Sequence, residues 1–134
     1  GKFLVGHYLQ SCNYPGYTVF CTDSAGQLGI GDPAFTLAVP VGQYLEGYVF
    51  LTPEDYAEDY VNIIFQEGTN LELDGAAISP PSEAIGFTDW RLARIEVFPG
   101  VHTINANQPV GTTVYGYGCH VSYAYPGGLK LEAF

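Results

Sequence analysis

Two cysteines, Cys12 and Cys21, are the residues whose spacing points most directly to a chemical bond. They lie in SCNYPGYTVFC, a stretch whose Asn, Pro, Gly and Tyr residues are typical of an irregular loop. A disulfide closing this loop would stabilise the fold by roughly 2–3 kcal/mol, chiefly by restricting the unfolded chain. A cytosolic protein would instead keep both thiols free; we expect the disulfide. Cys119 is left over, and since no arrangement of a histidine and a base around it is visible, a buried free thiol is expected there.

The three histidines are the next candidates, because imidazole is a common metal ligand. His7, His102 and His120 fall in separate predicted strands or strand ends, and His102 and His120 could meet across a sheet. The chain has no His-x-x-x-His or Cys-x-x-Cys spacing of the kind that metal motifs show. We therefore expect three separate histidines, each hydrogen-bonded or exposed, and no metal centre.

An acidic segment, TPEDYAEDY at Thr52–Tyr60, predicts the one short surface helix of the chain. Thr52 can cap it, Pro53 suits the first helical position, and the carboxylates that follow favour the positive end of a helix. The acidic residues Glu54–Asp59 could also hold calcium, which takes several oxygen ligands. Carboxylates spread along one helix rarely converge on one ion, so we expect a solvated helix start and no cofactor, with calcium as the alternative.

Charge and motifs exclude several classes of function. Four Lys and Arg residues stand against fourteen Asp and Glu, a net charge of −10. Nucleic acids and anionic membranes need clustered cations, so neither is expected as a partner, and no apolar run is long enough to cross a bilayer. The sequence has no Gly-rich phosphate loop and no Gly-x-Ser-x-Gly elbow. A glycoside hydrolase would need two opposed carboxylates, and nothing nominates a pair, so no enzyme is predicted.

The secondary-structure elements that must position these residues are predicted to be strands. In Arg91–Phe98, apolar residues at 93, 95 and 97 alternate with charged ones, the pattern of a half-buried strand. Similar short runs recur between Gly, Pro and Asp residues, which predicts a single all-β domain over residues 1–134, folded as an antiparallel β-sandwich or jelly roll. The predicted strands are Phe3–Tyr8, Ala34–Val39, Tyr44–Leu51, Tyr60–Phe65, Asn70–Leu73, Arg91–Phe98, His102–Asn105, Thr112–Gly118 and His120–Tyr125.

The most distinctive strand signal is VYGYGCHVSYAYPGG at Val114–Gly128. Successive strand side chains point to opposite faces, so a period-two reading gives this segment one bulky face and one nearly bare face. It predicts two closing strands whose tyrosine face is at least partly packed. The bulky face is Tyr115, Tyr117, Cys119, Val121, Tyr123 and Tyr125; the bare face is Gly116, Gly118, His120, Ser122 and Ala124.

Two segments without strand signals, Leu9–Asp32 and Gly75–Asp89, are predicted to be long loops. Long loops on a rigid sheet are where recognition sites tend to lie, and aromatic side chains give wide contact at low entropic cost. The candidate ligand-binding residues in or next to these loops are Tyr14, Tyr17, Phe87 and Trp90.

Two blocks of sequence resemble a known family. GDPAFTLAVPVGQYLEGYVFLTPEDYAEDYVNIIF begins at Gly31, and GVHTINANQPVGTTVYGYGCHVSYAYPGGL begins at Gly100. Their order and spacing are similar to the IgG-Fc-binding-protein-like extracellular domain, found in large secreted or surface proteins of bacteria and in a vertebrate mucus protein. The resemblance implies an all-β, non-enzymatic module of extracellular proteins, often repeated or joined to other modules. It supplies no functional residues.

These observations predict an extracellular or cell-surface module that binds or adheres to a protein or carbohydrate on another cell or matrix surface. An alternative is a structural spacer or oligomerisation domain, in which the bare face at Gly116 and Gly118 would let another strand or subunit approach closely. A carboxylate-dependent glycoside hydrolase is the third candidate.

Overall fold

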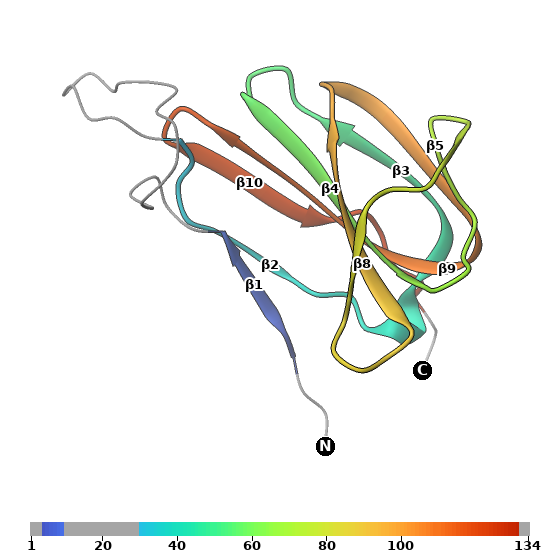
Figure 1. Ribbon diagram of the computed structural model, residues 1–134. Coiled ribbons are helices and arrows are strands. Elements are labelled where there is room, and N and C mark those ends of the chain that lie inside the picture. Colours follow the sequence, from blue (N-terminus) through green and yellow to red (C-terminus); the bar gives the residue numbers. More distant parts are fainter. Residues whose placement is uncertain (1–3, 10–29, 132–134) are drawn as a thin grey trace.

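The computed structural model describes residues 4–9 and 30–131, and over these residues its regular secondary structure is almost entirely strand (Figure 1). No described helix is long and apolar enough to span a membrane. The elements are β1 (Gly6–Leu9), β2 (Ala34–Leu37), a 3-10 turn (Val41–Gln43), β3 (Leu45–Thr52), β4 (Glu58–Gln66), β5 (Leu71–Leu73), β6 (Ala76–Ile78), β7 (Ser82–Ala84), β8 (Trp90–Val97), β9 (Gly100–Gly118) and β10 (Val121–Pro126).

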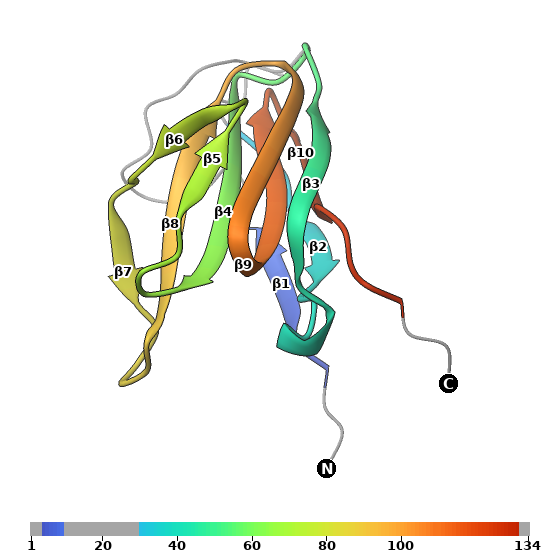
Figure 2. The same cartoon turned by 90° about the vertical axis from the view of Figure 1, so that its right-hand side faces the viewer.

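The strands pair antiparallel throughout the described part of the chain. β1 and β2 form a two-stranded sheet, and the other strands form a larger sheet in the order β6-β5-β9-β4-β8-β7, with β3 and β10 also paired to β9. The two views of the ribbon show this larger sheet strongly curled (Figures 1 and 2). The predicted antiparallel all-β class is confirmed.

The long strand β9 causes the curl, because its two halves have different neighbours. Residues 100–106 pair with β3 and β5, whereas residues 111–118 pair with β4 and β10. Pro109 lies between the segments that pair with β5 and β4, so its missing N–H interrupts neither ladder. The sequence predicted two strands here, His102–Asn105 and Thr112–Gly118; the structure joins them into one.

Buried residues alternate with more exposed ones along the central strands, and the buried residues form the core. In β4 the odd-numbered residues are buried and the even-numbered ones are half-buried on the outer face. Val61 pairs with Ile95 of β8 and with Val114 of β9, so three strands place apolar side chains on the same inner face. The buried cluster consists of Tyr48, Phe50, Val61, Ile63, Phe65, Leu71, Ala93, Val97, Ile104, Val110 and Val114.

The segment before β3 lies against β9 and β10. The Gly31 N–H donates to the Gly118 carbonyl over 2.7 Å, and the Asp32 N–H donates to Ser122 Oγ over 3.0 Å. Further along, the Tyr44 ring occupies the space above Gly111, where an added Cβ would come within 2.3 Å of the ring. A glycine is therefore required at 111 to let this segment approach the sheet.

The β9–β10 hairpin confirms the two closing strands but changes how their tyrosines are arranged. A turn at Cys119 and His120 pairs Gly118 with Val121, and residues opposite each other in an antiparallel pair share a face. The tyrosines of β9 and β10 therefore lie on opposite faces, and the expected single tyrosine face is wrong. Three of the tyrosines face a small residue: Tyr115 faces Ala124, Tyr117 faces Ser122, and Tyr123 faces Gly116.

The bare glycine face expected at Gly116 and Gly118 is filled from within the chain. Both glycines are buried. A Cβ added at Gly116 would lie 2.5 Å from the Tyr123 ring, and one added at Gly118 would lie 2.9 Å from the Val121 side chain. These glycines accommodate β10 and leave no room there for another strand or subunit.

The short helix predicted over Thr52–Tyr60 is wrong. Thr52 ends β3, β4 begins at Glu58, and a turn connects them. Instead of capping a helix, Thr52 Oγ1 donates to the Phe98 carbonyl over 2.7 Å and accepts from the Gly100 N–H over 3.0 Å. Long-range strand pairing overrides the local capping signals. The described helical element is the 3-10 turn, and the predicted Gly75–Asp89 loop contains β6 and β7.

Candidate functional site

The β7–β8 hairpin forms one end of the large sheet and carries the best-defined candidate site. β7 pairs with β8 through Ser82 opposite Ala93, with Glu83 opposite Leu92. Arg91 fixes the short strand: its Nε donates to Ser82 Oγ and its Nη2 donates to the Ser82 carbonyl, each over 2.8 Å. The hairpin is therefore held by side-chain bonds as well as by its ladder.

Phe87 stands at the tip of this hairpin and is fully exposed. The loop that carries it is closed by the Ile85 N–H, which donates to the Trp90 carbonyl over 2.8 Å. Thr88 Oγ1 donates to the Ile85 carbonyl over 2.7 Å and accepts from the Trp90 N–H over 3.2 Å. Gly86 takes the left-handed conformation that the turn needs, with φ 61°. An apolar ring is thus displayed on an ordered loop.

Trp90 begins β8 and is half-buried. Its ring contacts the Tyr44 ring edge-on, with centroids 5.8 Å apart. Next to it, Asp89 links the loop to β4: its Oδ2 accepts from Gln66 Nε2 over 3.1 Å, and its carbonyl accepts from the Glu67 N–H over 2.8 Å. Trp90 supports the loop, whereas Phe87 is the aromatic residue presented to solvent.

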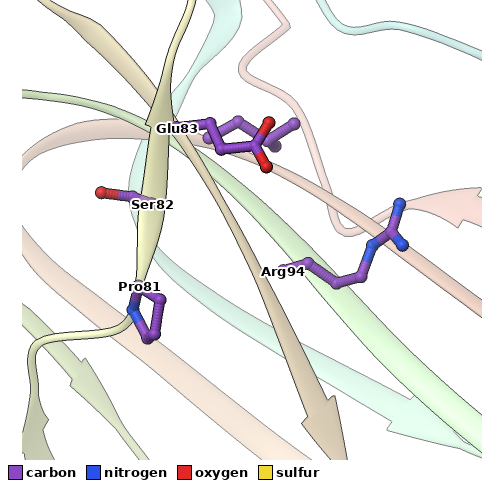
Figure 3. Close-up of a pocket in the computed structure, with 5 residues that line it drawn as sticks. Pro81, Ser82, Glu83 and Arg94 are labelled. Atoms are coloured by element: carbon purple, nitrogen blue, oxygen red, sulfur yellow. The ribbon is translucent and has the colours of Figure 1, made fainter.

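A shallow pocket of about 340 Å³ lies on the same hairpin, a size within the range of ligand sites. Glu83 and Arg94 project to one side of the hairpin, while Ser82 points to the other (Figure 3). The pocket combines a carboxylate, a guanidinium and apolar walls. We call Phe87 together with this pocket the hairpin surface; the pocket is lined by Pro81, Ser82, Glu83, Leu92 and Arg94.

An aromatic row extends from the pocket across the outer face of the sheet. The Arg94 guanidinium carbon lies 5.9 Å from the centre of the Tyr115 ring, a cation–π distance. The Tyr115 ring stacks on Tyr60 at 5.5 Å and meets Tyr117 edge-on at 5.9 Å. Its hydroxyl donates to Asn62 Oδ1 over 3.2 Å. The packed ring of Tyr115 therefore helps to position Arg94.

The hairpin surface suits reversible recognition. The hydroxyl of Ser82 is bonded to Arg91, whose guanidinium cannot act as a base. Arg91 therefore cannot activate Ser82 as a nucleophile, and the Ser82 side chain points away from Glu83 (Figure 3). Opposite charges beside apolar walls and an exposed ring can instead orient a partner through charge and apolar contact.

The predicted binding residues lie in different surroundings, and some lie outside the described part of the chain. It brings Phe87 and Trp90 into one hairpin, with Phe87 outward and Trp90 packed. Tyr14, Tyr17, Cys12 and Cys21 lie outside the described residues, so the predicted contacts and disulfide there stay predictions. Sequence reasoning missed Glu83 and Arg94. The alternation of Arg91–Phe98 did place Arg94 outward, but the strand β7 that brings Glu83 beside it was expected to be part of a loop.

His102 confirms the expectation of a hydrogen-bonded histidine. Its Nδ1 lies 2.7 Å from Asp74 Oδ2, and its Nε2 lies 2.7 Å from the Phe98 carbonyl oxygen. Burial of the ring works to lower the pKa of His102, but the bonds to Asp74 and Phe98 and the charges of Asp74 and Asp59 outweigh it and raise this pKa. The bond from His102 holds the pKa of Asp74 below its ordinary value.

The candidate metal ligands are spread over separate parts of the fold. His7 lies on β1, His102 on β9 and His120 in the β9–β10 turn. Within residues 4–9 and 30–131, no group of three or more His, Cys, Asp or Glu side chains could hold a metal ion. Asp59, from the acidic segment, is buried and accepts from the Tyr123 hydroxyl over 2.5 Å. Burial raises the pKa of Asp59 in spite of this bond.

Cys119 differs from its expected state. It lies in the β9–β10 turn, where it is exposed, and it does not carry a free thiol. The prediction of a buried free thiol is therefore wrong. The sequence pattern placed Cys119 on a packed face, but a two-residue turn ends the alternation before it.

Comparison with known proteins identifies the family. The family described as IgGFc binding protein matches residues 2–116, from before β1 to near the end of β9. No curated protein and no solved structure matches the chain. Since the family match covers most of the sequence, the chain belongs to the IgGFc binding protein family.

Proposed function

We propose that the chain is a non-enzymatic, extracellular binding module whose hairpin surface recognises a folded protein. Membership of a family of binding proteins supports binding as its general role. The net charge of −10 favours a protein surface over a nucleic acid or an anionic membrane as the partner. In this proposal the curled antiparallel sheet acts as a sandwich-like scaffold that holds the hairpin in place.

Phe87 is the observation that carries the proposal. A fully exposed aromatic ring on a loop with fixed hydrogen bonds loses little conformational entropy on binding. Binding hot spots are aromatic or arginine residues surrounded by other contacts. Arg94 and Glu83 line the pocket on the two strands of the same hairpin, and their opposite charges would fix the orientation of a partner.

The same hairpin surface would also support a role in adhesion. A module that presents one such patch in a longer extracellular chain could adhere to a protein on another cell or matrix surface. Tyr14 and Tyr17 stay candidate contact residues for this role. A protein suits this surface better than a carbohydrate, because Phe87 stands at the tip of a loop and does not form one wall of a groove in which a sugar ring could stack.

Binding of the IgG Fc fragment, the ligand in the family's name, tests the proposal directly. The wild-type chain is immobilised and Fc is added with and without its glycan. We expect binding by both forms and a loss of at least about tenfold in affinity for Phe87→Ser, as for a hot-spot residue. Phe98→Ser is the matched control, since Phe98 is also highly exposed but lies in the β8–β9 turn. No binding of either form would reject Fc, and binding lost with the glycan would favour carbohydrate recognition.

A further inference from the structure

A second surface, on strands β3 and β9, has an unusually apolar outer face. Leu51 pairs with Val101, and Val49 pairs with Thr103, so these four side chains share one face. Val49, Leu51 and Val101 are 68%, 56% and 70% exposed. The outward face of an antiparallel sheet usually carries polar residues. Three neighbouring aliphatic residues in this position indicate a face that is covered in the working protein.

Phe98 lies in the turn that enters β9 beside this face, and it is 86% exposed. Its backbone is held from inside the fold: its carbonyl accepts from Thr52 Oγ1 and lies 2.7 Å from His102 Nε2. Thr52 and His102 are both buried. The turn is therefore fixed by interior bonds while its ring projects to solvent. We call Val49, Leu51, Val101 and Phe98 the apolar face.

Among Asp, Glu, Lys and Arg, only carboxylates occur in strands β3, β5 and β9 and in the turns next to them. No Lys or Arg occurs between Gly31 and Trp90 or between Ile95 and Leu129. The imidazole of His102 lies beneath the face, where it is buried and bonded to Asp74. The exposed carboxylates are those of Glu46, Glu54, Asp55, Glu67, Glu72 and Asp74.

We infer that the apolar face binds a protein segment whose apolar side chains are flanked by Lys or Arg. The aliphatic centre would remove the apolar side chains from water, and the carboxylate rim would attract and orient the flanking cations. A second copy meeting this face with its own would oppose carboxylate to carboxylate, which like charges disfavour. The face lies on β3 and β9, apart from the hairpin surface on β7 and β8, so the two surfaces can be tested independently.

Three short peptides test this inference by titration into the isotopically labelled chain, with amide chemical shifts as the readout. One alternates Lys and Leu, one alternates Lys and Ser, and one alternates Glu and Leu. We expect the Lys–Leu peptide to bind, with the largest shifts at Val49, Leu51 and Val101. The Lys–Ser peptide keeps the charge but not the apolar side chains, and the Glu–Leu peptide reverses the charge; both are expected to bind at least about tenfold more weakly.

Variants then separate this surface from the first. Phe98→Ser and Val101→Ser are each expected to weaken binding of the Lys–Leu peptide at least about tenfold, whereas Phe87→Ser leaves it unchanged. Both substituted side chains are exposed, and dispersion of the amide spectrum reports whether each variant is folded. Equal binding of the Lys–Leu and Lys–Ser peptides, or shifts centred on Phe87 and Arg94, would overturn the inference without affecting the proposal for Fc.

Discussion

His102 donates from Nδ1 to Asp74 Oδ2 over 2.7 Å, and its Nε2 makes a second 2.7 Å contact with the Phe98 carbonyl oxygen. Both partners are acceptors, so the ring satisfies both only when each nitrogen carries a proton. The second carboxylate oxygen of Asp74 accepts from the Thr103 N–H over 2.8 Å. A charged imidazole therefore ties the β5–β6 turn and the Phe98 turn to β9.

This pair predicts a pH-dependent stability. The pKa of His102 is raised above 6.5, so its contribution is complete below pH 6.5 and is lost as pH rises through the folded-state pKa. The pKa of Asp74 is lowered below 3.8, so its contribution is present above pH 3.8 and is lost as pH falls through its folded-state pKa. The pair thus stabilises the fold most between pH 3.8 and pH 6.5.

Urea unfolding of wild type and His102→Gln measures this effect. Within that window we expect the variant to be less stable by about 1–3 kcal/mol, because a charge-assisted bond is lost and the part-buried Phe98 carbonyl loses one of its two donors. The difference should shrink as pH is raised from that window through the folded-state pKa of His102 into the alkaline range, because the imidazole then loses its charge. A difference in unfolding free energy that stays constant over this range would show that the imidazolium is not the stabilising species.

Asp59 and Tyr123 form a second buried pair in which the charge costs stability. Burial raises the pKa of Asp59 above 3.8, so the ionised carboxylate is disfavoured in the folded state at neutral pH. Asp59→Asn removes the charge but keeps an acceptor for the Tyr123 hydroxyl, and we expect stability at pH 7 equal to or above that of wild type. Tyr123→Phe leaves the carboxylate without its donor and should cost about 1–3 kcal/mol. Chemical denaturation of both variants compares them, and the reverse order would contradict this description of the pair.

Gly116 should tolerate no side chain. A Cβ there would lie 2.5 Å from Asp59 Oδ1, 2.5 Å from the Tyr123 ring and 2.9 Å from the Glu58 carbonyl. We expect Gly116→Ala to lower the free energy of unfolding by about 1–3 kcal/mol through overpacking. Gly42→Ala is the control, because nothing lies within 4 Å of its added Cβ. Equal thermal stability of the two variants would mean that β10 does not pack on β9 as described.

Local pattern was enough to predict the class of fold but not its long-range geometry. The alternation in Arg91–Phe98 and the hydrophobic runs elsewhere placed most strands. The sequence could not show that two predicted strands join into β9. A proline inside a strand usually indicates that the strand ends, and only the structure shows that Pro109 lies between the segments that pair with β5 and β4. The helix over Thr52–Tyr60 failed for a similar reason: its capping residue, Thr52, makes its bonds to the distant Phe98 turn.

For the candidate sites too, local features could be predicted from the sequence and long-range contacts could not. The exposed position of Phe87 could be predicted, because an aromatic residue among Gly, Thr and Asp in a turn is visible in the sequence. Glu83 and Arg94 could not be brought together without the β7–β8 register. The bond between His102 and Asp74 joins residues of different strands and turns, and neither residue has a neighbouring sequence signal for the other.

Hydrogen exchange of the chain in complex with Fc tests the central claim, that the hairpin surface is the binding surface. The experiment compares amide protection with and without Fc and uses Phe87→Ser as the control that should lose the effect. We predict added protection in residues 81–94, which include the pocket-lining residues and Phe87, and little change in β3. Binding of Fc with protection confined to other strands, or with residues 81–94 unprotected, would contradict the claim.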